Sequence, residues 1–308
     1  MIYIQFYTQN HGATALNTVG IVNFLEICMS TTERKTLLTH CSDEYGLIAK
    51  ITNICYQHKL NIIHNNEFVD NASGHFFMRT ELEGTFHDDE LLADLDQALP
   101  INSKRSLISS SRKKIVIMVT KEAHCLGDIL MKAYDGSLDV DIAAVVGNYD
   151  KLQTLTERFD IPYHHISHEG LTREEHEEKM LDVIKSYDPR YVVLAKYMRV
   201  LTANFVAQFP HKIINIHHSF LPAFIGAKPY QQAFDRGVKI IGATAHFVTN
   251  DLDEGPIIKQ DVIPVDHNFS ANDMAQAGRD VEKSVLSKAL NKVVNDHVFV
   301  YGNKTVIL

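Results

Sequence analysis

The segment KIVIMVTKEAHCLGDILMKAYDGSLDVDIAAVVG, residues 114–147, shows the pattern that decides the fold. It begins and ends with a run of mostly aliphatic residues, and apolar residues recur at helical spacing between the two runs. Near-continuous apolar strands that alternate with amphipathic helices are typical of a parallel sheet with helices on both faces. The segment therefore predicts an α/β domain with a mostly parallel sheet.

The alternation of strands and helices continues to the strand-like run KIINIH, residues 212–217. In sheets of this kind, chemically active residues gather beyond the carboxyl ends of the strands. Three polar segments fall at such ends: AKYMRV (195–200), NIHHS (215–219) and HFVTNDLDEGP (246–256). The sequence therefore places three candidate site segments at the carboxyl edge of the sheet.

The end of the chain predicts one long helix and a hairpin. Residues 270–294 begin with a serine that suits a helix cap and continue with an apolar stripe, so we expect this helix to serve in structural packing. The last residues, VFVYGNKTVIL, predict a hairpin that turns at Gly302 and Asn303.

Residues 36–110 show a different order of elements. A strand-like run and a turn precede a helical pattern, and two further strand-like runs flank the turn DNASG at residues 70–74. A second helical pattern with acidic residues at its start and a weak last strand complete the order βαββαβ. The polar, basic stretch SSSRKK (109–114) suits a linker, so the sequence predicts two domains, residues 36–110 and 113–308.

The order βαββαβ together with CSDEYGLIAKITNIC, residues 41–55, resembles an ACT domain, a ferredoxin-like regulatory module. The resemblance implies that the turn between the first strand and the first helix is where an amino acid binds. Asp43 and Gly46 fall on that turn and are the candidate effector-binding residues. Effector binding and subunit association both stay open as the role of this unit. Because ACT units commonly pair, a homo-oligomer is expected.

Composition and charge exclude several classes of partner. The 308-residue chain has a formal net charge of −8, so we expect neither nucleic acid nor a membrane as a partner. Its four cysteines show no metal-ligand spacing, which predicts reduced thiols in a cytoplasmic protein. Residues 1–30 contain no Lys or Arg and no apolar run long enough to span a bilayer. Residues 1–35 are therefore interpreted as an extension of doubtful importance.

Asn215, His217 and Asp253 combine an amide, an imidazole and a carboxylate in the second and third polar segments. An amide and a protonated imidazole can both donate to an oxyanion, and a carboxylate can keep the imidazole charged and orient or deprotonate water. Other uses stay open on the residues alone. Ser219 as a nucleophile lacks a G-x-S-x-G turn, and a zinc site of His217, His218 and Asp253 lacks a helical pair of histidines. Asn and Ser could also merely cap a helix, but two such motifs at sheet ends favour an active site.

The stretch INIHHSFLPAFIGAKPYQQAFDRGVKIIGATAHFVTNDLDEGPII, residues 214–258, resembles the catalytic core of the folate-dependent formyltransferase family. The resemblance extends from about residue 113 to the C-terminus and implies a Rossmann-like formyltransferase domain there. It implies that Asn215, His217 and Asp253 are the catalytic residues, and that His246 supports the loop that carries the Asp. The segment LAKYMRVL (194–201) resembles the part of the family whose backbone receives the pterin ring. The implied substrate-binding residues are Met198, Arg199, Val200, Leu201, His246, His218 and Gly226.

Several features bear on the acceptor of the formyl group. The segment TKEAHCLGD (120–128) holds a single glycine, so it lacks the glycine-rich turn that cradles the substrate phosphate in glycinamide ribonucleotide transferases. Lys121 as a replacement point charge stays open. His218 stands where transferases usually have proline. A net charge of −8 and no further domain argue against a tRNA substrate.

With an ACT domain in front of its core, the chain resembles the deformylase members of the formyltransferase family. The resemblance implies hydrolysis of 10-formyltetrahydrofolate to tetrahydrofolate and formate, with no metal, no cofactor and no covalent enzyme intermediate. It implies a role in supplying formate and balancing one-carbon folate pools, linked to purine biosynthesis. Glycine and methionine, end products of one-carbon metabolism, become the candidate effectors. Two alternatives stay open: formyl transfer to an unidentified amine, and an amino-acid sensor whose folate site is no longer used.

Overall fold

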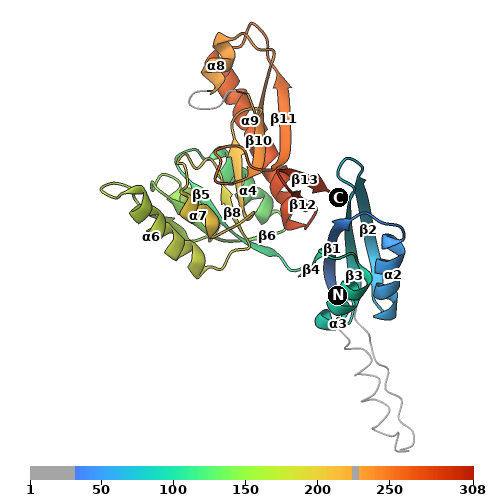
Figure 1. Cartoon of the computed structure of the whole chain (residues 1–308). Coiled ribbons are helices and arrows are strands. Elements are labelled where there is room, and N and C mark those ends of the chain that lie inside the picture. The colour runs from blue at the N-terminus through green and yellow to red at the C-terminus, as the bar shows by residue number, and fades with distance from the viewer. Residues whose placement is uncertain (1–31, 224–228) are drawn as a thin grey trace, which may run out of the picture.

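In the computed structural model, which describes residues 32–223 and 229–308, the N-terminal domain has the predicted order βαββαβ (Figure 1). Its elements are β1 (Glu33–Ser42), α2 (Leu47–Gln57), β2 (Asn61–Asp70), β3 (His75–Gly84), α3 (Asp88–Ala98) and β4 (Lys104–Ser109). The strands form an antiparallel sheet in the order β2-β3-β1-β4. Glu33 to Lys35 already pair with β3, so this domain starts slightly before residue 36. Most of the interpreted extension, and Gly226, lie outside the described residues.

The two helices cover one face of this sheet because their apolar residues recur on one side. α2 buries Leu47, Ile51, Ile54 and Cys55, and these pack with buried residues of α3, β1 and β3 in one core. Gly46 precedes α2 with φ 84°, a left-handed conformation that glycine adopts without steric cost. The predicted turn between β1 and α2 is therefore formed.

The second domain is built on a seven-stranded sheet in the order β11-β10-β9-β8-β5-β6-β7 (Figure 1). Neighbours from β9 to β7 in this order are parallel, as the alternation of strands and helices predicted. The elements up to β9 are β5 (Lys113–Val119), α4 (His124–Tyr134), β6 (Val140–Gly147), α5 (Gln153–Glu157), β7 (Tyr163–His165), α6 (Arg173–Ser186), β8 (Tyr191–Leu194), α7 (Ala203–Ala207) and β9 (Ile213–His217). They are followed by α8 (Pro229–Asp235), β10 (Ile240–Phe247), β11 (Ile257–Pro264) and α9 (Ala271–Val294).

The strand β5 shows why the apolar runs of this domain are nearly continuous. Ile115, Ile117 and Val119 pack into a core that includes residues of α4 and α9. Val116 and Met118 alternate with them and pack into a second core with residues of α6 and α7. Both faces of the sheet are therefore buried, which confirms the predicted architecture.

The strand β10 departs from the predicted pattern because it runs antiparallel to β9. His246 pairs with Asn215, and β10 ends with Phe247 beside Ile214, near the start of β9. The expectation that residues 246–256 lie at the carboxyl end of a parallel strand is therefore wrong. An apolar strand has the same hydrophobic pattern whether it runs parallel or antiparallel to its neighbour. The sequence pattern therefore could not predict the direction of β10.

The helix α9 begins where the sequence predicted. The side chain of Ser270 accepts a hydrogen bond from the backbone N–H of Asp273 and caps the helix. The buried residues of α9 pack against the β9–β10 side of the sheet. Neither this 24-residue helix nor any other helix among the described residues is long and apolar enough to cross a membrane.

The C-terminal hairpin connects the second domain with the first. β12 (Val298–Tyr301) and β13 (Lys304–Ile307) pair around the predicted turn, and they lie beside the N-terminal sheet (Figure 1). The ring centroids of Phe299 and Phe77 are 5.5 Å apart. The hairpin thus adds an aromatic contact between the domains.

Polar contacts strengthen the same junction. The buried Arg79 of β3 donates to the backbone carbonyls of Asn295 and Asp296. Lys113, the first residue of β5, lies 3.0 Å from the carboxylate of Asp296, and both side chains are buried. Two hydrogen bonds from Arg79 therefore hold the segment after α9 to the N-terminal domain, and the ion pair ties the start of β5 to the same segment.

Candidate active site

The strand β9 places Asn215 and His217 on the same face of the sheet, because alternate residues of a strand point to opposite faces. Ile214 and Ile216 pack into the core that includes α9, so Asn215 and His217 face the other side. His217 is the last residue of β9, and 6% of its surface is exposed. Two of the predicted catalytic side chains therefore share one wall at the carboxyl end of β9.

The loop after β10 brings Asp253 to this wall. The N–H of Phe247 donates to the carbonyl of Pro256, so the loop closes on its own base. Asp253 has φ 58°, a left-handed conformation that is uncommon for residues other than glycine. Its Oδ2 lies 3.2 Å from Nδ1 of His217, and its Oδ1 lies 3.7 Å from Nε2 of His246. Asp253 therefore reaches His217 because the loop after β10 folds back toward the sheet, and not because β10 itself ends there.

His246 orients the amide of Asn215. Burial lowers the pKa of His246 and outweighs the opposing effect of the Phe247 carbonyl, so the ring is neutral at physiological pH. Its Nδ1–H donates to that carbonyl at 2.9 Å, which leaves Nε2 to accept from the Asn215 amide at 3.2 Å. The second hydrogen of this amide remains available to a bound molecule.

Asp253 and His217 form a hydrogen-bonded pair. Burial of the Asp253 carboxyl works to raise its pKa, but the hydrogen bond from His217 and the positive charge that this imidazole carries when protonated hold the pKa below its usual value. Asp253 is therefore ionised and fixes the orientation of the imidazole. Nε2 of His217 is buried and has no hydrogen-bond partner among the described residues. Because an unpaired buried nitrogen is costly, this atom is suited to a substrate or a water molecule.

A cavity of about 460 Å³ opens in front of these side chains. This volume lies in the range of pockets that bind small molecules. Asn215, His217 and Asp253 all line the cavity, so the structure brings the three candidate catalytic residues together. The candidate substrate residues that line it too are Met198, Arg199, Val200, Leu201, His246 and His218, whereas Gly226 lies outside the described residues.

Several lining residues fall within the polar segments that the sequence singled out but were not named individually as site residues. Most of them belong to the loop after β10, and their nearness to Asp253 in the sequence could have indicated them. Thr120 was missed as well: its hydroxyl accepts from the N–H of Met198 at 2.9 Å and fixes the segment after β8. The missed lining residues are Leu194, Tyr197, Ile216, Val248, Thr249, Asn250, Asp251 and Leu252.

Among residues 32–223 and 229–308, one group has ligand atoms spaced for a metal ion: His124, Cys125 and Glu282, all within 4.8 Å of one another. Burial, together with the charge of Glu282, raises the pKa of the Cys125 thiol well above its usual value. Nζ of Lys196 lies 3.2 Å from the Glu282 carboxylate. A neutral thiol and a carboxylate already paired with an ammonium are poor ligands, so we interpret the group as a hydrogen-bonded cluster.

Asp43 and Gly46 belong to the N-terminal domain, whereas the cavity with Asn215, His217 and Asp253 lies in the second domain. Asp43 donates its N–H to the carbonyl of Gly74, which ties the β1–α2 turn to the turn between β2 and β3. The neighbouring Tyr45 is fully exposed. The two candidate effector residues therefore lie on an accessible turn.

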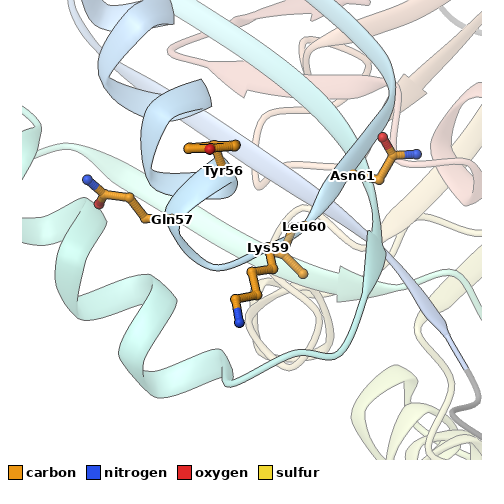
Figure 2. Close-up of a pocket in the computed structure, with 5 residues that line it drawn as sticks. All are labelled: Tyr56, Gln57, Lys59, Leu60 and Asn61. Carbon is orange, nitrogen blue, oxygen red and sulfur yellow. The ribbon is translucent and has the colours of Figure 1, made fainter. Parts of the chain in front are cut away.

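A separate, open hollow of about 540 Å³ lies at the end of α2, and its lining residues are drawn in Figure 2. It is lined by Tyr56, Gln57, Lys59, Leu60 and Asn61. Lys59 is the one charged side chain among these five, and neither Asp43 nor Gly46 lines the hollow. This hollow therefore lacks the acid–base groups of the cavity at β9.

Comparison with known proteins identifies the family. Residues 113–290 match the family model described as formyl transferase, and residues 35–100 match that of the ACT domain. A formyltetrahydrofolate deformylase of Escherichia coli is 69% identical over 280 residues, which cover 91% of this chain and 100% of that protein. The chain belongs to the formyltetrahydrofolate deformylase family. A solved formyltetrahydrofolate deformylase of Pseudomonas syringae is 38% identical, with a TM-score of 0.84 over 94% of this chain and 100% of that one.

The deformylase family shares its catalytic fold with transferases. A solved glycinamide ribonucleotide transformylase of Symbiobacterium toebii is 28% identical, with a TM-score of 0.62 over 64% of this chain and 94% of that one. The same α/β core therefore occurs in proteins named for hydrolysis and in proteins named for transfer, and the difference must lie in the residues around the site.

Proposed function

We propose that the chain hydrolyses 10-formyltetrahydrofolate to tetrahydrofolate and formate, as the names of its deformylase relatives indicate. The observation that carries the proposal is the group of Asn215, His217 and Asp253 on one wall of the cavity. These are an amide donor, an imidazole and an ionised carboxylate. The attack of water on a formyl carbon needs groups of these types.

Negative charge develops on the formyl oxygen when water adds to the carbon. The Asn215 amide and the protonated Nε2–H of His217 stabilise this charge, and the loss of one such donor typically costs about 2.7–4 kcal/mol of barrier. Asp253 keeps His217 charged through Nδ1 and positions the attacking water. The three residues thus act on the oxyanion and on the nucleophile.

Protons and bonds balance without an added reactant. Water gives one proton to Asp253 as its oxygen bonds to the formyl carbon. The bond from this carbon to N10 then breaks, and N10 takes a proton from His217. The proton on Asp253 passes to His217, and the formic acid ionises in water. The site returns to its starting state with no covalent intermediate, and the proposed reaction uses no metal or cofactor.

The segment 198–201 is proposed to receive the pterin ring. The side chains of Met198 and Val200 are apolar and about half exposed, at 55% and 50%, where they line the cavity. Because the N–H of Met198 is bonded to Thr120, the ring would pair with backbone groups of the following residues. Arg199 supplies a positive charge for an anionic folate.

The alternative is formyl transfer to an amine. It is tested by measuring formate and tetrahydrofolate together in buffers with and without a primary amine. Hydrolysis predicts equal amounts of both products without the amine. A strict need for the amine would favour transfer, and folate binding without turnover would favour a disused site.

The N-terminal domain is proposed to regulate the enzyme and to associate subunits into a homo-oligomer. Its ACT fold and the accessible turn with Asp43 and Gly46 support the binding of glycine or methionine. Calorimetric titration of wild type and Asp43→Ala with both amino acids tests this. No heat with wild type would contradict effector binding.

A cytoplasmic location and a role in supplying formate to purine biosynthesis complete the proposal. Cys41, Cys55 and Cys125 are free and buried, as expected for a reducing compartment. Burial raises the pKa of Cys41 and of Cys55 to about 11, so these thiols are inert. Fractionation of native cells followed by immunoblotting tests the location.

A further inference from the structure

Three side chains from separate parts of the chain meet around one buried carboxylate, that of Glu282 in α9. His124 at the start of α4 places Nε2 2.7 Å from Oε2 of Glu282, and Lys196 after β8 places Nζ 3.2 Å from the same oxygen. Tyr230 of α8 donates its hydroxyl to Oε1 at 2.7 Å. We call His124, Lys196, Tyr230 and Glu282 the Glu282 cluster.

The Glu282 cluster places charged groups away from water, which is unfavourable for the free energy of folding. Burial works to raise the pKa of Glu282, but the His124 hydrogen bond, the Lys196 charge and the Tyr230 hydrogen bond bring it to about 2. Lys196 is buried and has φ 60°, a strained conformation for a residue with a side chain. Buried ion groups of this kind seldom add stability over apolar residues of the same volume, so they point to a role at the site.

Tyr230 is packed directly against the backbone of α9. A Cβ atom added at Gly278 would lie 2.1 Å from the Tyr230 hydroxyl, so only glycine admits the ring at this place. Because the hydroxyl is held by Glu282 and the ring by Gly278, Tyr230 forms a fixed wall.

His218 separates the Glu282 cluster from the catalytic residues. Its ring stacks on that of His217 with centroids 5.1 Å apart, and its other neighbour Tyr230 lies at 6.3 Å. His218 lines both the 460 Å³ cavity and a smaller apolar cavity of about 130 Å³, which Tyr230 also lines. Lys196 and Glu282 line neither of these cavities. The ring of His218 thus lies next to both His217 and the cluster residue Tyr230.

We propose that the Glu282 cluster determines the acceptor: it fills the side of the site where an amine substrate would approach the formyl carbon, and so leaves room for water alone. The inference rests on the proposed hydrolysis. Water and an amine attack the same carbon and need the same oxyanion donors, so size and access distinguish them. The related transformylase fold shows that the core itself is compatible with transfer.

The test opens this volume and measures the product. In the variant Lys196→Ala/Glu282→Ala both charges of this ion pair leave together, so neither is left buried without the other. The matched control, Lys113→Ala/Asp296→Ala, removes another buried ion pair, at the domain junction. Each protein receives 10-formyltetrahydrofolate labelled with carbon-13 in the formyl group, with hydroxylamine as the probe amine. NMR then measures N-formylhydroxylamine against formate, corrected for the rate without enzyme.

In the transfer reaction the hydroxylamine nitrogen bonds to the formyl carbon, the bond to N10 breaks, and N10 takes the proton that the amine loses. We expect the ratio of formylated amine to formate to rise at least tenfold in the cluster variant and to stay at the wild-type value in the control. An unchanged ratio in a folded variant that still consumes substrate would overturn the inference. So would complete loss of turnover in a folded variant, because the cluster would then serve the chemistry itself.

If the double variant does not fold, Tyr230→Ala decides in the same way. It opens the wall next to His218 and leaves Glu282 paired with His124 and Lys196. A raised ratio supports the inference, and an unchanged ratio contradicts it. Wild type that releases no formate without an amine would instead contradict the proposed hydrolysis, so the two failures are distinguishable.

Discussion

Nδ1 of His217 lies 3.2 Å from Oδ2 of Asp253, while Nε2 of the same ring is buried and unpaired among the described residues. The carboxylate holds one nitrogen, and the other is left for the reaction. In the proposed reaction, this relationship links the strand that carries the oxyanion donors with the loop that carries the acid–base group.

Asp253→Asn should lower the rate of formate release at saturating substrate by about 10²–10⁴, the usual contribution of a general base. The amide cannot accept the proton of water and cannot keep His217 charged. The matched control is Glu254→Gln, which removes the exposed carboxylate next to it and does not line the cavity. Near-normal turnover of Asp253→Asn would contradict the assigned role.

Asn215→Asp should lower kcat by about 10²–10³ and change KM little, because the lost donor acts on the oxyanion of the transition state. The carboxylate has the same shape as the amide but donates no hydrogen bond and repels the developing charge. Asn268→Asp, at an exposed position, is the control. A rise in KM with unchanged kcat would show that Asn215 serves substrate binding alone.

His218 should make the protein less stable in mild acid. Burial, Lys196 and His217 lower its pKa from the usual 6.5 to about 4, although Glu282 and Asp253 act in the opposite direction. Between these values the unfolded chain binds a proton that the folded protein does not, so the free energy of unfolding falls as the pH drops from 6.5 to 4.

The measurement is denaturant unfolding at pH 7 and at pH 5. His218→Gln should lose less stability than wild type over this interval, whereas His165→Gln, at an exposed position, should behave as wild type does. An equal loss in wild type and His218→Gln would show that this ring does not titrate as described.

Asp296→Ala should destabilise the protein by about 3–5 kcal/mol, because it leaves the buried ammonium of Lys113 without its partner. The double variant Lys113→Met/Asp296→Leu should lose much less, since no unpaired charge remains. Urea unfolding of both variants measures the difference. Equal losses would mean that the pair contributes through side-chain volume and not through charge.

Much of the fold was predictable because single segments contain the signal. The run 115–119 is apolar at every position, and its residues pack alternately into two cores, as a strand buried on both faces requires. The turn at Gly46 and the helix cap at Ser270 follow from local conformational preference. The direction of β10 has no such local signal.

The candidate site was predictable where motifs are short, and less so where partners are distant. Asn215 and His217 share a strand, and Asp253 belongs to the segment that the formyltransferase resemblance covered. Glu282 lies within a helix whose apolar stripe predicted structural packing alone. The charge of its buried carboxylate is compensated by His124 and Lys196, which come from remote parts of the chain. Pairwise contacts of this kind leave no periodic pattern in a sequence.

The central claim is that water is the acceptor of the formyl group. The most direct measurement is the formate formed from 10-formyltetrahydrofolate in amine-free buffer made with oxygen-18 water, analysed by mass spectrometry. We predict one oxygen-18 atom in each formate and one formate for each tetrahydrofolate. The claim would be contradicted if tetrahydrofolate formed only after an amine was added, with formylated amine in place of formate.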